Sequence, residues 1–188
     1  MKQAQVLTEK DIKRVLAHIA RKPFAARNKC MLQLSWLTGM RVGEIAALSV
    51  SDVLDAEGNV RSQIQLKAEQ TKGDSARTVL LSAHAQTELS IFLHKGKKIA
   101  ASDPVFKSRV GKRFSANSLC QVFLRIYDEA GLDKATSHSG RRTFITTLAH
   151  KGVSVRVLAE LAGHRSIATT QRYIELNDNV LRAAVELV

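Results

Sequence analysis

The sequence predicts a mainly helical domain that carries one small antiparallel β-sheet. Over most of the 188 residues, apolar side chains recur at helical spacing, as in helices that bury one face. Between about residues 61 and 81, apolar and polar residues alternate instead, which is typical of strands. The chain has the length of one domain, and its 45% hydrophobic residues are enough for a core. We therefore expect an α+β fold in which helices dominate.

The N-terminal part predicts three helices. Thr8 precedes acidic residues and suits the N-cap of a first helix that ends near residue 21. A second helix is expected over residues 25–38, with Gly39 as its C-cap. A third, short helix follows over residues 41–48.

The middle of the chain predicts the sheet. Residues 61–67 and 76–81 alternate as two strands of a hairpin, with residues 71–75 near its turn. Residues 50–54 are expected to add a third strand. Beyond the sheet, the helical spacing returns in five segments, which are residues 83–93, 115–130, 138–151, 155–162 and 167–173.

The charge of the chain indicates a polyanionic partner. Lys and Arg number 29 against 17 Asp and Glu, which gives a formal net charge of +12. A balance this basic favours DNA, RNA or an acidic membrane surface.

Other features indicate a reduced, cytoplasmic setting. The N-terminus lacks a signal-peptide pattern, and no apolar run reaches the length of a membrane span. Cys30 and Cys120 lie in separate apolar helical patterns, so we expect buried, reduced thiols. The histidines lack the short spacings of metal ligands, and no metal site is predicted.

Two arginines, two histidines and a tyrosine together predict attack on a phosphodiester. The planar fork of an arginine stays ionised and donates two hydrogen bonds to phosphate oxygens, and Arg41 and Arg141 are candidates for this contact. His138 precedes Arg141 by three residues at a predicted helix start, which places both on one face. His164 follows Gly163 further along the chain.

Tyr173 is the candidate nucleophile. A phenol is largely protonated at neutral pH and needs nearby cations and a proton acceptor before it can attack. The only other tyrosine is Tyr127. It shares a helical apolar pattern with Phe123 and Ile126, which predicts a core position instead.

Three short stretches and this tyrosine carry a resemblance to a known family. The stretches are residues 38–45 around Arg41, residues 138–144 and residues 162–164. Their order and spacing, together with Tyr173, resemble the tyrosine recombinase (phage integrase) family. The resemblance implies the catalytic-domain fold of that family, over nearly the whole chain.

The resemblance also implies a role for each matching residue. Arg41 and Arg141 would grip the phosphate, His138 would assist proton transfer, and His164 would hydrogen-bond the scissile phosphate. Tyr173 would be the nucleophile.

Two further assignments follow from the family pattern. Lys72, in a Lys-Gly turn before the second predicted strand, would protonate the leaving 5′ oxygen, with Lys67 as its rival. Glu44, three residues after Arg41, would hold Arg41 in place without contacting the phosphate itself.

Two positions depart from the pattern. Gly140 stands where leucine is usual, and Arg142 stands where histidine is frequent. We expect Gly140 to change helix packing and Arg142 to contact the DNA backbone.

The function implied is site-specific DNA recombination through a 3′-phosphotyrosyl intermediate, without cofactor or metal. The implied partners are double-stranded DNA and further copies of the chain, as a tetramer on two sites. A type IB topoisomerase-like activity and a non-catalytic DNA-binding regulator are alternatives. The regulator would require a damaged site.

Residues 1–188 are expected to form a single catalytic domain, with no separate N-terminal core-binding domain. The chain is either part of a longer protein or a naturally short recombinase. The apolar tail, residues 174–188, would dock on a neighbouring protomer or fold back on its own core.

Overall fold

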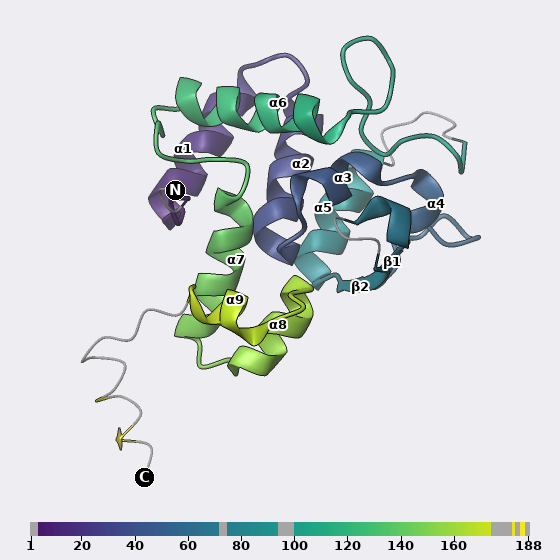
Figure 1. Ribbon diagram of the computed structural model, residues 1–188. Coiled ribbons are helices and arrows are strands. Elements are labelled where there is room, and N and C mark those ends of the chain that lie inside the picture. Colours follow the sequence, from purple (N-terminus) through teal and green to yellow (C-terminus); the bar gives the residue numbers. More distant parts are fainter. Residues whose placement is uncertain (1–3, 72–74, 94–99, 174–181, 183–184, 187–188) are drawn as a thin grey trace.

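The structure is a computed structural model that describes residues 4–71, 75–93, 100–173, 182 and 185–186 (Figure 1). It confirms the predicted class, because helices surround one two-stranded antiparallel sheet. The elements are α1 (Glu9–Ala20), α2 (Ala25–Thr38), α3 (Val42–Ala47), α4 (Val50–Val53), β1 (Gln63–Leu66), η1 (Ala68–Gln70), β2 (Arg77–Leu80), α5 (Ala83–Leu93), α6 (Ala116–Glu129), α7 (Ser139–His150), α8 (Val155–Ala162) and α9 (Ile167–Gln171).

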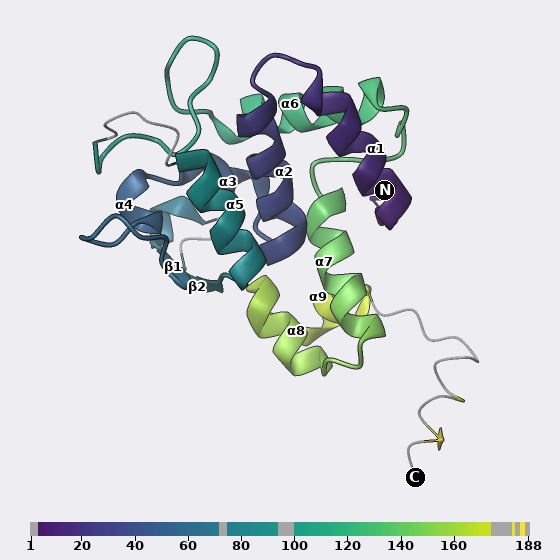
Figure 2. The ribbon, with the colours of Figure 1, turned by 180° about the vertical axis from the view of Figure 1, so that it is seen from behind.

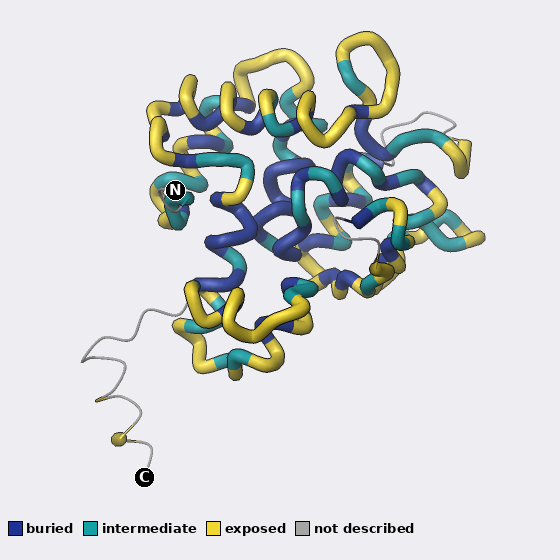
Figure 3. The backbone as a smooth tube through the Cα atoms, in the orientation of Figure 1, coloured by how far each residue is buried: buried dark blue, intermediate teal, exposed yellow. Residues whose placement is uncertain are grey.

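Helix α2 forms the centre of the molecule. It packs against α1, α5 and α7, and the two opposite views place it between them (Figures 1 and 2). Because neighbours cover it on several sides, buried residues occupy most of its length, as the dark segment in Figure 3 shows. Such a helix lacks the one-sided apolar stripe of a surface helix.

The first helix begins where the sequence predicted. The Thr8 hydroxyl accepts from the backbone N–H of Asp11 at 3.1 Å, and the Asp11 carboxylate accepts in return from the backbone N–H of Thr8 at 3.0 Å. This reciprocal capping box satisfies two N–H groups that a helix start leaves open. Next to it, the N–H of Leu7 donates to the Thr143 hydroxyl at 2.8 Å, which ties the start of α1 to α7.

The third strand predicted at residues 50–54 is wrong, because this segment is helix α4. The backbone N–H of Ser49 donates to the Asp52 carboxylate at 2.8 Å, which caps a helical turn. Val50 and Val53 are both buried, as spacing by three in a helix allows. Local capping therefore outweighs the strand propensity of the valines, and Leu54 forms only an isolated bridge to Val60.

The hairpin forms with a defined register. Gln63 pairs with Leu80, and Leu66 pairs with Arg77. Ile64 and Leu66 point into the core, as alternation requires. The connection between the strands contains η1, and residues 72–74 within it lie outside the described part of the chain.

Four helix ends meet around the predicted catalytic residues. Helix α2 ends at Gly39, just before Arg41, and α7 begins after His138. Helix α8 ends at Gly163, next to His164. Helix α9 stops at Gln171, which is shorter than the predicted range, so Tyr173 follows the helix.

The two cysteines differ in burial. Cys30 is buried, whereas Cys120 is only half-buried and corrects the prediction of two core thiols. The apolar tail at residues 174–188 lies largely outside the described residues. In the part of the chain that is described, none of the helices combines the length and apolar character needed to cross a membrane.

Gly140 lets α7 approach α2 closely. A Cβ atom added at Gly140 would lie 2.8 Å from the Cβ of Ser35 on α2 and 3.2 Å from its backbone carbonyl carbon. The first distance is shorter than Cβ contacts in proteins and the second is tighter than most of them, so glycine lets α7 pack here without displacing Ser35. The departure of Gly140 from the family pattern therefore has a packing reason.

We predict that Gly140→Ala lowers the free energy of unfolding by about 1–3 kcal/mol, as overpacking in a filled core does. Gly43→Ala is the matched control, because its Cβ would meet only Ala116 at an ordinary 3.5 Å. Alanine in helix α3 should then stabilise by up to about 1 kcal/mol. Urea denaturation of both variants measures the difference. Equal stabilities would contradict the packing argument.

Candidate active site

The C-terminal end of α8 gathers three arginines. The last carbonyl groups of a helix lack partners within it and carry partial negative charge, so guanidinium groups bind there favourably. Each of three successive carbonyls accepts from a different arginine. The contacts are Arg77 Nη1 to Leu161 O at 3.1 Å, Arg141 Nη2 to Ala162 O at 2.6 Å, and Arg41 Nη2 to Gly163 O at 3.1 Å.

Two glycines make room for these arginines. Gly163 caps α8 in the left-handed conformation at φ 62°, and a Cβ there would lie 2.6 Å from Cδ of Arg77. Gly39, at φ 67°, offers its carbonyl to Arg141 Nη1 at 2.7 Å. A Cβ at Gly39 would lie 2.6 Å from the Phe144 ring. Both helix ends therefore require glycine.

Glu44 lies between two of the arginines and is only 1% exposed. Its carboxylate accepts from Arg41 Nη1 at 2.8 Å and from Arg77 Nη2 at 2.7 Å. Burial by itself would raise the pKa of Glu44, but the hydrogen bonds and charges of Arg77 and Arg41 outweigh it and hold that pKa below its ordinary value. Glu44 is therefore a carboxylate at neutral pH, in contact with Arg41.

Arg77 is a site residue that sequence reasoning missed. The alternation of β2 did contain a signal, because Arg77 falls on the same face as the buried Val79 and Leu81. A charged residue on a buried strand face needs an opposite charge. The partner, Glu44, is 33 residues away, and only the tertiary fold identifies it.

The cluster has excess positive charge. Among the described residues, the ion-pair partner of Arg41 and Arg77 is one shared carboxylate, that of Glu44. Arg141 is only 4% exposed, and burial, followed by the charges of Arg41 and Arg77, lowers its pKa to about 9. A bound anion would offset these charges, so the site is suited to a phosphate.

His164 is neutral at physiological pH. Burial lowers its pKa from 6.5 to about 4, and the charges of Arg141, Arg41 and Arg77 add to the shift. Its Nδ1 lies 2.8 Å from the hydroxyl of the buried Thr170. The ring stacks on that of Tyr173, with centroids 5.8 Å apart and planes at 21°.

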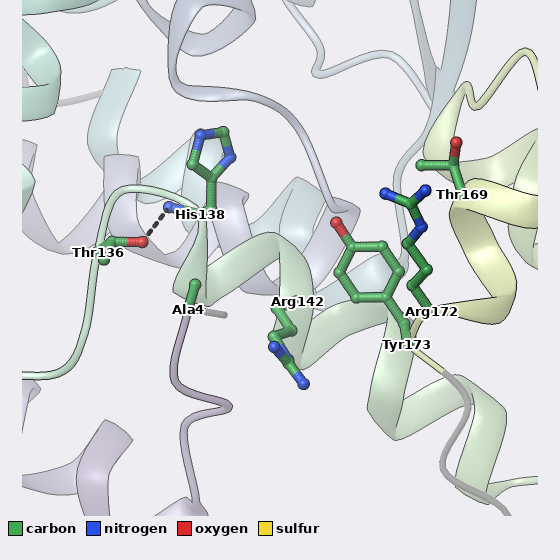
Figure 4. A pocket seen from close by; sticks show the side chains of 7 residues that line it. All are labelled: Ala4, Thr136, His138, Arg142, Thr169, Arg172 and Tyr173. Atoms are coloured by element: carbon green, nitrogen blue, oxygen red, sulfur yellow. Dashed lines mark hydrogen bonds between the residues drawn. The ribbon is translucent and has the colours of Figure 1, made fainter. Parts of the chain in front are cut away.

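Two hollows lie beside these residues, and Thr169 borders both. One, of about 450 Å³, contains Tyr173 together with His138 and Arg142. In Figure 4 the Tyr173 hydroxyl is directed to the side of the hollow where His138 lies. The Arg142 guanidinium carbon is 5.9 Å from the centroid of the Tyr173 ring. The other hollow, of about 410 Å³, is bordered by Arg41, Arg77 and His164.

The structure thus brings most predicted residues together. Arg41, Glu44, Arg141 and His164 surround the end of α8, and Tyr173 joins them through its ring contact with His164. His138 and Arg142 lie on the other side of Tyr173, whereas Arg141 is buried and does not line these two hollows.

Two further residues of the sequence analysis are Lys72 and Tyr127. Lys72 falls outside the described residues. The flanking Thr71 and Ser75 border the hollow of Arg41, and the Thr71 hydroxyl donates to the Ser75 carbonyl at 2.7 Å. The core position predicted for Tyr127 is confirmed, since this side chain is 0% exposed and burial raises its pKa.

The chain matches the phage integrase family over residues 5–180 and belongs to that family. Among similar curated proteins, the tyrosine recombinase XerD of Halalkalibacterium halodurans is 31% identical over 167 residues, which are 86% of this chain and 54% of that protein. The tyrosine recombinase XerC of Roseiflexus sp. is 30% identical over 161 residues, or 82% of this chain and 49% of that protein. This chain therefore spans about half the length of these relatives.

Solved structures are similar as well. The XerA recombinase superimposes with a TM-score of 0.76 at 27% identity, covering 100% of this chain and 66% of that chain. The XerH site-specific recombinase, in a pre-cleavage complex with its difH substrate, superimposes with a TM-score of 0.69 at 26% identity. The match covers 98% of this chain and 54% of that chain. These neighbours confirm the recombinase catalytic-domain fold predicted from the sequence.

The lowered pKa of His164 predicts a loss of stability in mild acid. The unfolded chain takes up the imidazole proton near pH 6.5, whereas the folded chain does so only near pH 4. Lowering the pH through this window therefore favours unfolding. The urea midpoint of the wild type should fall more between pH 7 and pH 4.5 than that of His164→Asn. His150→Asn, an exposed histidine on α7, should behave as wild type, and identical slopes for all three proteins would refute the assignment.

Proposed function

We propose that this protein is a site-specific recombinase that cuts and rejoins DNA strands through Tyr173. The phenolic oxygen attacks the phosphorus, and the bond to the 5′ oxygen breaks. A 3′-phosphotyrosyl link and a free 5′-hydroxyl result. A 5′-hydroxyl from a second duplex then attacks the link and releases Tyr173. Each step exchanges one phosphoester bond for another, so the energy of the bond is retained without a cofactor.

The arrangement of the arginines supports this proposal most directly. Charge builds up on the non-bridging oxygens of the phosphate in the transition state, and fixed donors stabilise it best because they need not reorganise. Arg41 and Arg141 are each held by contacts to backbone carbonyls. A guanidinium has more N–H groups than these contacts use, so further donors can serve a phosphate. Arg41, Arg141 and His164 would form this cradle.

The histidines have separate parts in the proposal. His164 is neutral, and its Nδ1 lies next to the Thr170 hydroxyl. In the proposal Nδ1 accepts from this hydroxyl, so that Nε2 carries the ring proton and would donate to the phosphate. His138 borders the same hollow as Tyr173, where it would take the phenolic proton. Lys72 would return a proton to the leaving 5′ oxygen. Its loop begins and ends beside Arg41 at Thr71 and Ser75.

The proposed partner is double-stranded DNA, in a tetramer of this chain on two sites within the cytoplasm. The formal net charge of +12 supports binding to a polyanion. XerH, similar in fold and 26% identical, forms its pre-cleavage complex with a DNA substrate. Arg142 and Arg172, which line the Tyr173 hollow, would contact phosphates that flank the cut.

We predict that Tyr173→Phe abolishes covalent attachment to a nicked suicide duplex while DNA binding is retained. The natural control is Tyr127→Phe, because these are the only two tyrosines of the chain and Tyr127 is buried. It should form the covalent complex as the wild type does. Denaturing gels detect the protein–DNA band, and gel shifts detect binding. A band that persists in Tyr173→Phe would refute the nucleophile, and binding without any band would favour a non-catalytic regulator.

A further inference from the structure

We propose that Arg77 is a positioning residue for strand cleavage. It orients Arg41 through the carboxylate that both arginines share, and it fixes that pair to the end of α8. This inference rests on the proposed function and assigns a residue that the family resemblance does not supply.

The contacts of Arg77 identify it as a holding residue. Its Nε donates to Glu44 Oε1 at 3.1 Å, and its Nη2 donates to Glu44 Oε2 at 2.7 Å. The third nitrogen, Nη1, donates to the carbonyl of Leu161 at 3.1 Å. All three guanidinium nitrogens are therefore engaged, and the side chain is only 11% exposed. Because these three contacts go to groups on α3 and α8, the guanidinium fixes the position of Glu44 relative to the end of α8.

The effect of Arg77 reaches Arg41 through both oxygens of the Glu44 carboxylate. Glu44 Oε1 accepts from both Arg77 Nε and Arg41 Nη1, and Oε2 also accepts the backbone N–H of Arg41 at 2.8 Å. The bidentate grip of Arg77 fixes the plane of the carboxylate. That plane in turn sets the direction of the Arg41 guanidinium.

Arg77 also joins two parts of the fold that border the Arg41 hollow. It lies at the first position of β2, directly after the loop that closes through Thr71 and Ser75. Its bond to Leu161 attaches this strand to the end of α8, just before His164. Arg77 therefore links the start of β2, Arg41 and the end of α8 that precedes His164.

The test is the single-turnover rate of covalent attachment to a nicked suicide duplex, measured for Arg77→Gln, Arg77→Lys, Glu44→Gln and the Arg77→Gln/Glu44→Gln double variant. We expect Arg77→Gln to slow attachment by roughly 10- to 100-fold, as misplacement of a catalytic group does. Arg77→Lys should recover only part of the rate, because an ammonium cannot hold both carboxylate oxygens. The double variant should be slower than Arg77→Gln, but by less than the separate effects of the two substitutions would give, since both changes act through one contact.

A pH profile separates positioning from a loss of stability. The charged and titratable groups around the carboxylate are Arg41, Arg77, Arg141 and His164. Burial raises the pKa of Glu44, and the contacts of Arg77 lower it. Without Arg77, the pKa of Glu44 therefore rises, and the carboxylate takes up a proton at higher pH. The rate of Arg77→Gln, relative to the double variant, should therefore fall as the pH is lowered from 7 to 5. A purely structural role would leave this ratio constant.

Arg113→Gln is the matched control. Arg113 also uses its guanidinium to bind backbone carbonyls, those of Ala47 and Leu48, together with the Ser49 hydroxyl. Its loss should lower stability without slowing attachment in the folded protein. Fluorescence anisotropy at two salt concentrations reports DNA affinity, and we expect Arg77→Gln to leave the salt dependence unchanged.

The outcomes are distinguishable. Wild-type cleavage with an unchanged rate in Arg77→Gln overturns the positioning role and leaves the proposed function standing. Additive effects of the two substitutions, or a reduced salt dependence of binding, would show that Arg77 contacts DNA itself. A wild-type rate of attachment in Arg77→Lys would contradict the requirement for a bidentate contact between Arg77 and Glu44. The absence of wild-type attachment overturns the proposed function and this inference together.

Discussion

The contact of three arginines with the end of α8 is the interaction on which the site depends. Arg41 comes from the start of α3, Arg77 from β2 and Arg141 from α7, and each donates to a carbonyl of α8. Carbonyl groups at a helix C-terminus attract cations without neutralising them. The arginines are thus held in place while they keep their charge, and among the described residues Glu44 is the carboxylate that pairs with two of them. A site built this way stays open to an anionic ligand.

Close packing makes this arrangement possible. The α8 end can receive Arg77 because Gly163 has no side chain, and the Gly39 carbonyl can receive Arg141 because Gly39 leaves room for Phe144. Gly140 brings α7, which carries Arg141, against Ser35 of the central helix. Three glycines at helix contacts therefore set the positions of side chains that are themselves large and charged. Gly39 and Gly163 also adopt the left-handed conformation, so they end their helices and turn the chain in addition to leaving room for neighbouring side chains.

Local signals in the sequence were sufficient for much of the fold. The N-cap Thr8 and the C-cap Gly39 predicted helix ends that the structure has. The order of the three stretches that resemble the family predicted which residues would lie close together. Residues 50–54 were assigned wrongly because two valines favour a strand, whereas the Ser49–Asp52 contact supports a helical turn. Arg77 was missed for a different reason. Its partners Glu44 and Leu161 come from α3 and α8, and spacing along the chain does not show which helix end packs on which strand.

The end of α8 also has a mechanical consequence. Its three accepting carbonyls belong to Leu161, Ala162 and the cap residue Gly163, and the arginines that bind them come from three different elements. The end of α8 is therefore attached at the same time to the start of α3, to β2 and to α7. A rotation of α8 would disturb all three bonds at once and would carry His164 with it. The end of α8 therefore couples the positions of the three arginines to one another and to that of His164.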